Sequence, residues 1–143
     1  MMQQVPVIKA LADETRLRLV NLFVTSGKSL CVCEMVDALK LPQYQISKHL
    51  NILKNSGLIS VQKSGTWAYH SVNRDIIQNE KLYSFLKEFL SGDIFDEDIK
   101  NLDMRLMLRE GDRCVVGFVD EKELVQLIVK KQPKSKISKG SMV

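Results

Sequence analysis

The stretch from Ser29 to Gly57 constrains the fold more than any other part of this 143-residue sequence. Ser29 is a good N-cap, and the apolar residues after it recur with helical spacing. Lys40 and Leu41 form a short turn, and Pro42 suits the first position of a following helix that Gly57 ends. Two helices joined by so short a turn predict a helix-turn-helix unit.

The second helix of this unit has one apolar and one polar face. Ile46, Leu50 and Leu53 form the apolar stripe. The other face presents side chains that hydrogen-bond to base edges or phosphates, namely Gln43, Gln45, Ser47, Lys48 and the nearby His49. We therefore predict that this helix contacts double-stranded DNA.

The sequence also predicts elements on both sides of this unit. Upstream, Asp13 is suited to cap a helix that Gly27 ends. Downstream, residues 58–63 and 67–73 are rich in strand formers, and residues 64–66 supply a turn. A hairpin directly after a DNA-reading helix is the wing of a winged helix. Lys63 is placed to contact the DNA backbone there, although a lysine on a surface hairpin is commonly only solvated.

Two of the three cysteines, Cys31 and Cys33, stand one residue apart at the start of the first helix of the unit. Three cysteines cannot all pair with one another, and a reducing compartment disfavours disulfides, so this pair is available for metal or redox chemistry. The helix dipole favours the thiolate there. Residues two apart in a regular helix point about 200° from each other, so one ion binds both only if the first turn distorts.

Composition indicates one compact domain with an arm. The net charge of +4 is uneven, because residues 1–73 and 130–143 are basic whereas residues 74–129 are acidic. The basic N-terminal half suits contact with phosphates. No apolar run approaches the length of a membrane span, and the first residues do not have the pattern of a secretory signal. We therefore expect a cytoplasmic protein.

The chain resembles the ArsR/SmtB family of winged-helix repressors, in particular its arsenic-responsive members, in four motifs: ALADETRLRLVNLF, LCVCEMVDALKL, PQYQISKHLNILKNSGLI and SGTWAYHSVN. The resemblance implies a mainly α, dimeric winged helix-turn-helix protein with a β-hairpin wing. Such proteins occupy palindromic operators as homodimers and leave when a metal or metalloid binds. The best-known arsenic-responsive members have a third cysteine three positions after the second, where this sequence has Val36.

The resemblance implies As(III) or Sb(III) as the effector, with no permanent cofactor. These ions prefer thiolates, usually three in a pyramid, and Cys31 and Cys33 supply two. The third ligand is open: Cys114 of either subunit, a small thiol from solution, or none if the effector is an organoarsenical. Cys114 is equally well explained as a buried free cysteine that packs as a small hydrophobe.

Other metals fit the sequence less well. Zinc sensors of this family use histidines and carboxylates on the dimer helix, which corresponds here to residues 73–92 and contains no histidine. Cadmium and lead sensors add cysteines from an N-terminal arm, and residues 1–30 contain none. The dimer helix carries an apolar stripe that suits either self-association or coverage of its own core: Leu82, Phe85, Leu86, Phe89 and Leu90.

We divide the chain into three parts. Residues 1–92 form the winged-helix DNA-binding and dimerisation domain, residues 93–131 form a C-terminal extension of uncertain role, and residues 132–143 have the composition of a disordered basic tail. The extension contains an acidic stretch, a short strand pattern over Cys114–Val119 and a helical pattern over Glu121–Lys131.

Three functions are compatible with these features. The first is a repressor released from its operator by trivalent arsenic or antimony bound to Cys31, Cys33 and Cys114. The second is a repressor of the same fold that senses oxidants or reactive sulfur through its thiols. The third, a thiol oxidoreductase, is disfavoured because both histidines lie in the predicted DNA-reading unit. We therefore expect no enzymatic activity.

Overall fold

The computed structural model describes residues 2–132, apart from the side chains of Ile77 and Gln78. The predicted tail therefore lies, except for Gln132, outside the described residues. The described residues form one antiparallel hairpin and seven helices, in the order α1 (Gln4–Leu11), α2 (Glu14–Ser26), α3 (Val32–Leu39), α4 (Gln43–Asn55), β1 (Ile59–Ser64), β2 (Trp67–Val72), α5 (Ile77–Phe89), α6 (Asp93–Leu106) and α7 (Glu121–Lys131). The prediction of a mainly helical winged helix-turn-helix fold is confirmed.

Local signals fix most helix ends. The Oδ2 atom of Asp13 accepts a hydrogen bond from the Arg16 N–H at 3.1 Å, and Gly27 ends α2 with a left-handed φ of 67°. Two boundaries differ from the prediction. Cys31, with extended backbone, is the N-cap of α3 in place of Ser29, and Pro42 is the N-cap of α4 instead of its first residue.

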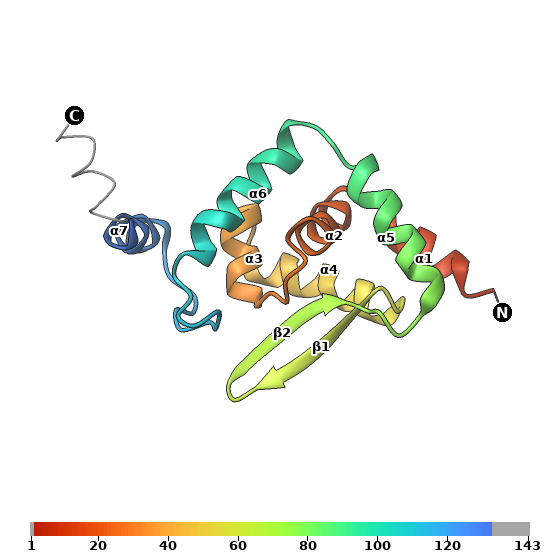
Figure 1. The fold of residues 1–143 in the computed structure, drawn as a ribbon, viewed down its shortest axis with the longest axis horizontal. Helices are drawn as coiled ribbons and strands as arrows, with labels where there is room; N and C mark the ends of the chain where they lie inside the picture. The colour runs from red at the N-terminus through yellow and green to blue at the C-terminus, as the bar shows by residue number, and fades with distance from the viewer. Residues whose placement is uncertain (1, 133–143) are drawn as a thin grey trace.

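The main core surrounds α2. In Figure 1, α3, α4, α5 and α6 lie around this helix, while α1 and α5 are at the opposite end of the molecule from α7. Leu19, Leu22 and Phe23 of α2 are buried at the centre of this core. The helix-turn-helix and α6 of the extension therefore share one apolar interior, whereas Leu108, Leu124 and Ile128 form a separate small cluster under α7.

The hairpin projects from this body as the predicted wing (Figure 1). Its register runs from the pair Ile59 and Val72 to the pair Ser64 and Trp67. Backbone hydrogen bonds in both directions between Leu30 and His70, at 2.7 and 2.8 Å, join β2 to the segment before α3. The wing is thus attached directly to the residue that precedes Cys31.

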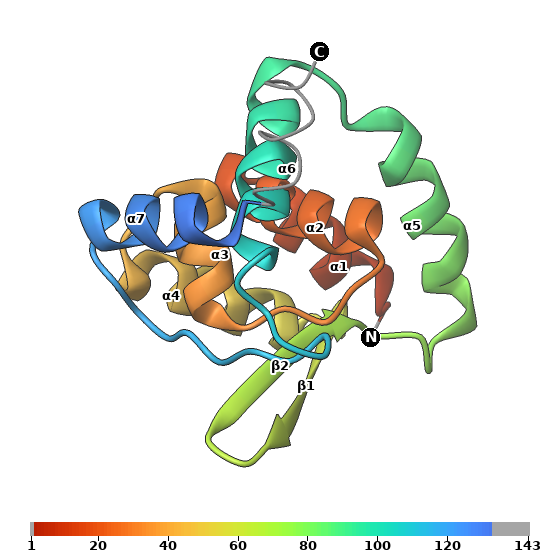
Figure 2. The same ribbon diagram turned by 60° about the vertical axis from the view of Figure 1, so that its left-hand side comes forward.

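The extension packs along α3. The helical pattern predicted over Glu121–Lys131 is confirmed as α7, whereas α6 was not predicted. Arg18 of α2 donates two hydrogen bonds of 2.8 Å to Asp98 of α6. Arg105, also on α6, donates to Asp37 of α3 at 2.6 Å. After α6 the chain runs past the base of β2 before it reaches α7 (Figure 2). These buried ion pairs fix the extension against α2 and α3.

The prediction of a short strand over Cys114–Val119 is wrong. The backbone groups of this segment bond to side chains instead of a neighbouring strand. The Cys114 N–H donates to the Tyr69 hydroxyl at 3.0 Å, and the carbonyls of Val116 and Gly117 accept from Arg105 at 2.7 and 2.9 Å. Within residues 2–132, no helix combines the length and apolar character needed to cross a bilayer.

Candidate thiol site and DNA-reading face

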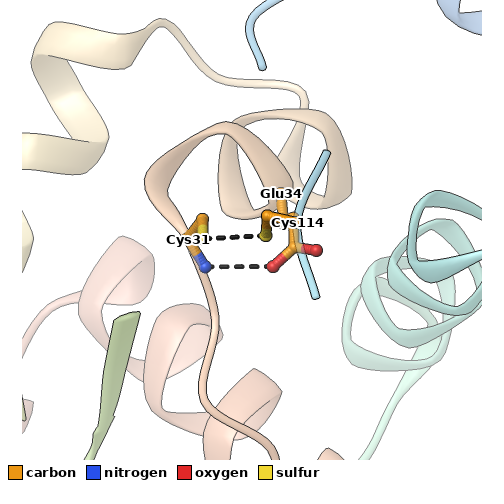
Figure 3. A group of neighbouring side chains, drawn as sticks. All are labelled: Cys31, Glu34 and Cys114. Carbon is orange, nitrogen blue, oxygen red and sulfur yellow. Dashed lines mark hydrogen bonds between the residues drawn. The ribbon is translucent and has the colours of Figure 1, made fainter. Parts of the chain in front are cut away.

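All three cysteines gather in one buried cluster. Cys31, Cys33 and Cys114 are 2%, 3% and 5% exposed, and Trp67 and Tyr69 of β2 pack against them. Cys31 Sγ lies 2.8 Å from Cys114 Sγ of the same chain, and Figure 3 shows these two thiols directed toward each other. The extension thus carries the third cysteine to the start of α3.

Cys33 belongs to the same buried cluster but not to the group of ligand atoms that lie within 4.8 Å of one another, which come from Cys31, Glu34 and Cys114. Its Sγ is 3.7 Å from the carbonyl oxygen of Val116, two residues after Cys114. Because Cys31 precedes α3 with φ −86° and ψ 156°, the two thiols of the Cys-x-Cys pair are not both inside a regular helix. The expectation that the first helical turn must distort therefore rested on a wrong helix boundary.

A buried carboxylate completes the surroundings of the cluster. The side-chain oxygens of Glu34 lie close to both Cys31 and Cys114, and ligand atoms from these three residues are within 4.8 Å of one another. Glu34 accepts from the Cys31 N–H at 3.0 Å (Figure 3) and from two nitrogens of Arg109 at 2.7 and 2.8 Å. Burial alone would raise the pKa of Glu34, but these hydrogen bonds hold it below its usual value.

Arg109 fixes the extension at this point. It also donates to the Ser29 carbonyl at 2.6 Å and lies 5.9 Å from the centroid of the Tyr69 ring. The pairing of Arg109 with Glu34 was not predicted, because the two residues are 75 positions apart and no short motif contains both. The sequence feature that could have indicated a buried ion pair was Glu34 itself, a charged residue in the first turn of a largely apolar helix.

The three thiols differ in acidity. A hydrogen bond to Cys33, together with burial, raises the pKa of the Cys31 thiol, and burial raises the pKa of Cys114. The hydrogen bond from Cys31 lowers the pKa of Cys33, and the nearby Arg105 guanidinium acts in the same direction. Cys33 is therefore the sulfur that most readily becomes a thiolate, the form that attacks an electrophile or binds a soft ion.

The outward face of α4 carries most of the predicted DNA contacts. Gln43, Ser47 and Lys48 are exposed on it, Gln45 is half-buried, and Lys63 is exposed on β1. Three further polar side chains were missed: Tyr44, which is 73% exposed, Asn51 and Lys54. Helical spacing places Asn51 and Lys54 one and two turns after Ser47, so the sequence could have indicated that they share its face.

His49 lies apart from this face. It is buried against α2, where its Nδ1 atom is 3.1 Å from Arg16 Nη1 and 3.8 Å from Asp13 Oδ2. The prediction that it accompanies Gln43 and Ser47 on the polar face is therefore not met in the structure. His49 instead joins α4, the proposed recognition helix, to the cap of α2.

The two histidines predict a dependence of stability on pH. Burial is the main cause that lowers the pKa of both His49 and His70 from 6.5. The unfolded chain therefore takes up protons first as the pH falls, and the free energy of unfolding decreases below about pH 6.5. We expect urea midpoints to fall between pH 7.5 and 5.5, and to fall less in a His49→Gln, His70→Gln double variant. Parallel curves for the two proteins would contradict this assignment.

Comparison with known proteins gives the family. Residues 13–61 match the family described as bacterial regulatory protein, arsR family. An uncharacterised HTH-type transcriptional regulator of Methanocaldococcus jannaschii is 43% identical over 72 residues, which are 50% of this chain and 80% of that relative. The chain belongs to the ArsR/SmtB family. ArsR/SmtB proteins are DNA-binding transcription regulators, and the resemblance seen in the sequence is confirmed.

Other relatives of this ArsR/SmtB protein include named repressors. The arsenical resistance operon repressor of Escherichia coli is 42% identical over 72 residues, 50% of this chain and 61% of that protein. The chain thus spans less than two thirds of the length of that repressor. The transcriptional repressor PagR of Bacillus anthracis has a similar structure, with a TM-score of 0.53, 27% identity, and coverage of 62% of this chain and 93% of that one.

Proposed function

We propose that this protein is a transcriptional repressor that leaves its operator when As(III) or Sb(III) binds to Cys31, Cys33 and Cys114. The observation that carries the proposal is the burial of all three thiols in one cluster, with Cys31 and Cys114 sulfurs 2.8 Å apart. The names of several relatives as arsenic regulators support the choice of metalloid. Three thiols of a single chain match the thiolate number that trivalent arsenic prefers.

Arsenite can bind three thiols without an added base. Arsenite is present near neutral pH as As(OH)₃, and condensation with three thiols forms three As–S bonds and releases three water molecules. The raised pKa values of Cys31 and Cys114 keep their protons available for the departing hydroxyl groups. Cys33, whose pKa is lowered, is the first thiol expected to react.

The packing of α3 provides the route from thiols to DNA. Binding of three sulfurs to one ion moves Cys31 and Cys33 relative to Cys114. Helix α3 begins at Val32, between Cys31 and Cys33, so it moves with them. Met35, Ala38 and Leu39 of α3 are buried in the core that also contains the apolar stripe of α4. We infer that the shift of α3 re-orients the recognition helix, at a coupling free energy of about 1 to 3 kcal/mol.

A direct test is fluorescence anisotropy of the reduced protein on DNA from its own promoter, titrated with arsenite. The wild type should dissociate, whereas Cys33→Ser should stay bound at the same concentrations. Ser60→Ala, an exposed change on β1, controls for an unrelated loss of a polar side chain. DNA binding that arsenite does not affect in the wild type would refute the proposed effector.

An oxidant-sensing repressor is the second candidate, and the same sulfur pair favours it. Cys31 and Cys114 can close into a disulfide when a peroxide accepts their two electrons and two protons and becomes water. Such a disulfide uses only two of the three clustered thiols, and several relatives are named as arsenic regulators, so we rank this function below metalloid sensing. Release from DNA by hydrogen peroxide but not by arsenite would reverse the ranking.

The protein is proposed to act as a homodimer through α1 and α5. Phe85 and Phe89 of α5 are 54% and 64% exposed and stack with ring centroids 4.9 Å apart, while Val5 and Ile8 of α1 are also exposed. The predicted apolar stripe is thus divided: Leu86 and Leu90 are buried in the core, and the two phenylalanines face outward. A two-fold dimer would cover them and match a palindromic operator.

Phe89→Lys is expected to weaken this dimer. The substitution is present in both protomers of a two-fold dimer, so two aromatic anchors are lost at roughly 2 kcal/mol each, and the dissociation constant should rise about a thousandfold. Sedimentation equilibrium measures the change, with circular dichroism to verify the helical content. Val125→Lys, at a similarly exposed apolar position on α7, is the matched control and should leave the dimer unchanged. Equal dissociation of both variants would argue against this interface.

A further inference from the structure

A small groove lies between the recognition helix and the wing. Its volume is about 180 Å³. Ser47, Asn51 and Lys54 of α4 line one side, and Val61 and His70 of the hairpin line the other. The three α4 residues are also on the outward face of this helix. The groove therefore opens on the same side of the molecule as the proposed DNA contacts.

His70 occupies this groove in an unusual state for a buried polar side chain. It is 9% exposed, and its backbone is fixed by the two hydrogen bonds with Leu30. Its Nδ1 atom is buried and has no hydrogen-bond partner among the described residues. The neutral ring carries one N–H, and in the tautomer with that proton on Nε2 the buried Nδ1 atom needs no acceptor. Nε2 is then the donor that the ring can direct into the groove.

The charge of the groove favours an anion. Lys54 is the only charged residue among the lining residues that the structure describes, and no carboxylate is among them. Ser47 and Asn51 add a hydroxyl and an amide that can donate hydrogen bonds. A cation surrounded by neutral donors is the arrangement that proteins use to hold a phosphate group.

We propose that this groove binds one backbone phosphate of the operator. Lys54 supplies the charge, while Ser47, Asn51 and His70 supply hydrogen bonds. The inference rests on the proposed DNA-binding function and adds a fixed anchoring point to it. Because both α4 and the wing contribute to the groove, a phosphate held there would set the depth and angle at which the recognition helix enters the DNA.

The test combines protein variants with DNA in which single phosphates are replaced by neutral methylphosphonates. In anisotropy titrations, the wild type should lose about tenfold in affinity at one modified position in each half-site. Lys54→Gln should bind unmodified DNA about tenfold more weakly, and the slope of its affinity against salt concentration should fall by about one phosphate contact. A methylphosphonate at that position should not weaken its binding any further. His70→Phe should also reduce the penalty at that position.

Lys63→Gln is the matched control, because Lys63 is on the wing but does not line the groove. It should keep the full penalty at the identified position. Equal penalties in the wild type and Lys54→Gln at every position would overturn the inference. A different result would assign the groove to a free anion. Inorganic phosphate at constant ionic strength would then compete with DNA for the wild type but not for Lys54→Gln, and no single methylphosphonate would weaken DNA binding. A wild type that binds no promoter DNA would refute the proposed function itself.

Discussion

Cys114→Ser is expected to raise the arsenite concentration for half-maximal release from DNA at least tenfold while DNA affinity stays unchanged. Serine keeps the size of the side chain but removes the soft ligand that trivalent arsenic prefers. Cys114 lies in the extension beside the start of α3 and is not among the proposed DNA contacts, so loss of its sulfur should not affect those contacts directly. Anisotropy on promoter DNA measures both quantities in one titration.

The design must exclude a third sulfur from solution. We therefore specify a phosphine as the reductant, because a thiol reductant could itself supply the missing ligand. Val115→Ser, at the exposed neighbouring position, is the matched control and should respond to arsenite as the wild type does. If Cys114→Ser is released as easily as Val115→Ser, two thiols suffice and the three-thiol site is refuted. A phenylarsenical, which needs only two thiolates, should still release Cys114→Ser.

Arg105→Met is expected to lower the free energy of unfolding by about 3 to 5 kcal/mol, the usual cost of removing one partner from a buried ion pair. Arg105 is 2% exposed and is held by Asp37 and by the carbonyls of Val116 and Gly117. Its removal leaves a buried carboxylate and two carbonyls without their donor. Urea unfolding followed by circular dichroism measures the loss.

Two variants separate this effect from a general intolerance of methionine. Arg113→Met, at an exposed position in the same segment, should change stability by less than about 0.5 kcal/mol. Arg105→Met combined with Asp37→Leu removes both charges of the pair and should recover part of the lost stability. A double variant no more stable than Arg105→Met would show that the carbonyl contacts, and not the ion pair, carry the effect.

The sequence was informative where structure is local. The cap at Asp13, the stop at Gly27 and the turn before α4 are decided by residues a few positions apart, and each was predicted to within a residue or two. The wing followed in the same way from strand formers around Gly65. These signals were sufficient for the winged helix-turn-helix because this unit consists of short elements in close succession.

Long-range packing was not accessible in the same way. Helix α6 was not predicted because its buried face carries the charged residues Asp98 and Arg105, which interrupt the apolar stripe. Each is buried only because an ion-pair partner on α2 or α3 meets it, and the sequence does not indicate such pairs. The position of Cys114 depends on α6 in turn, so the sequence left its proximity to Cys31 open.

The aromatic neighbour of the thiol cluster has a practical consequence. Trp67 is the only tryptophan in the chain, and it packs against the three cysteines. The molecule therefore contains its own fluorescent reporter at the candidate effector site. Intrinsic emission can follow occupancy of the thiols while a dye on the DNA follows dissociation. Stopped-flow recording of the two signals would establish whether effector binding precedes departure from the operator, without any label on the protein.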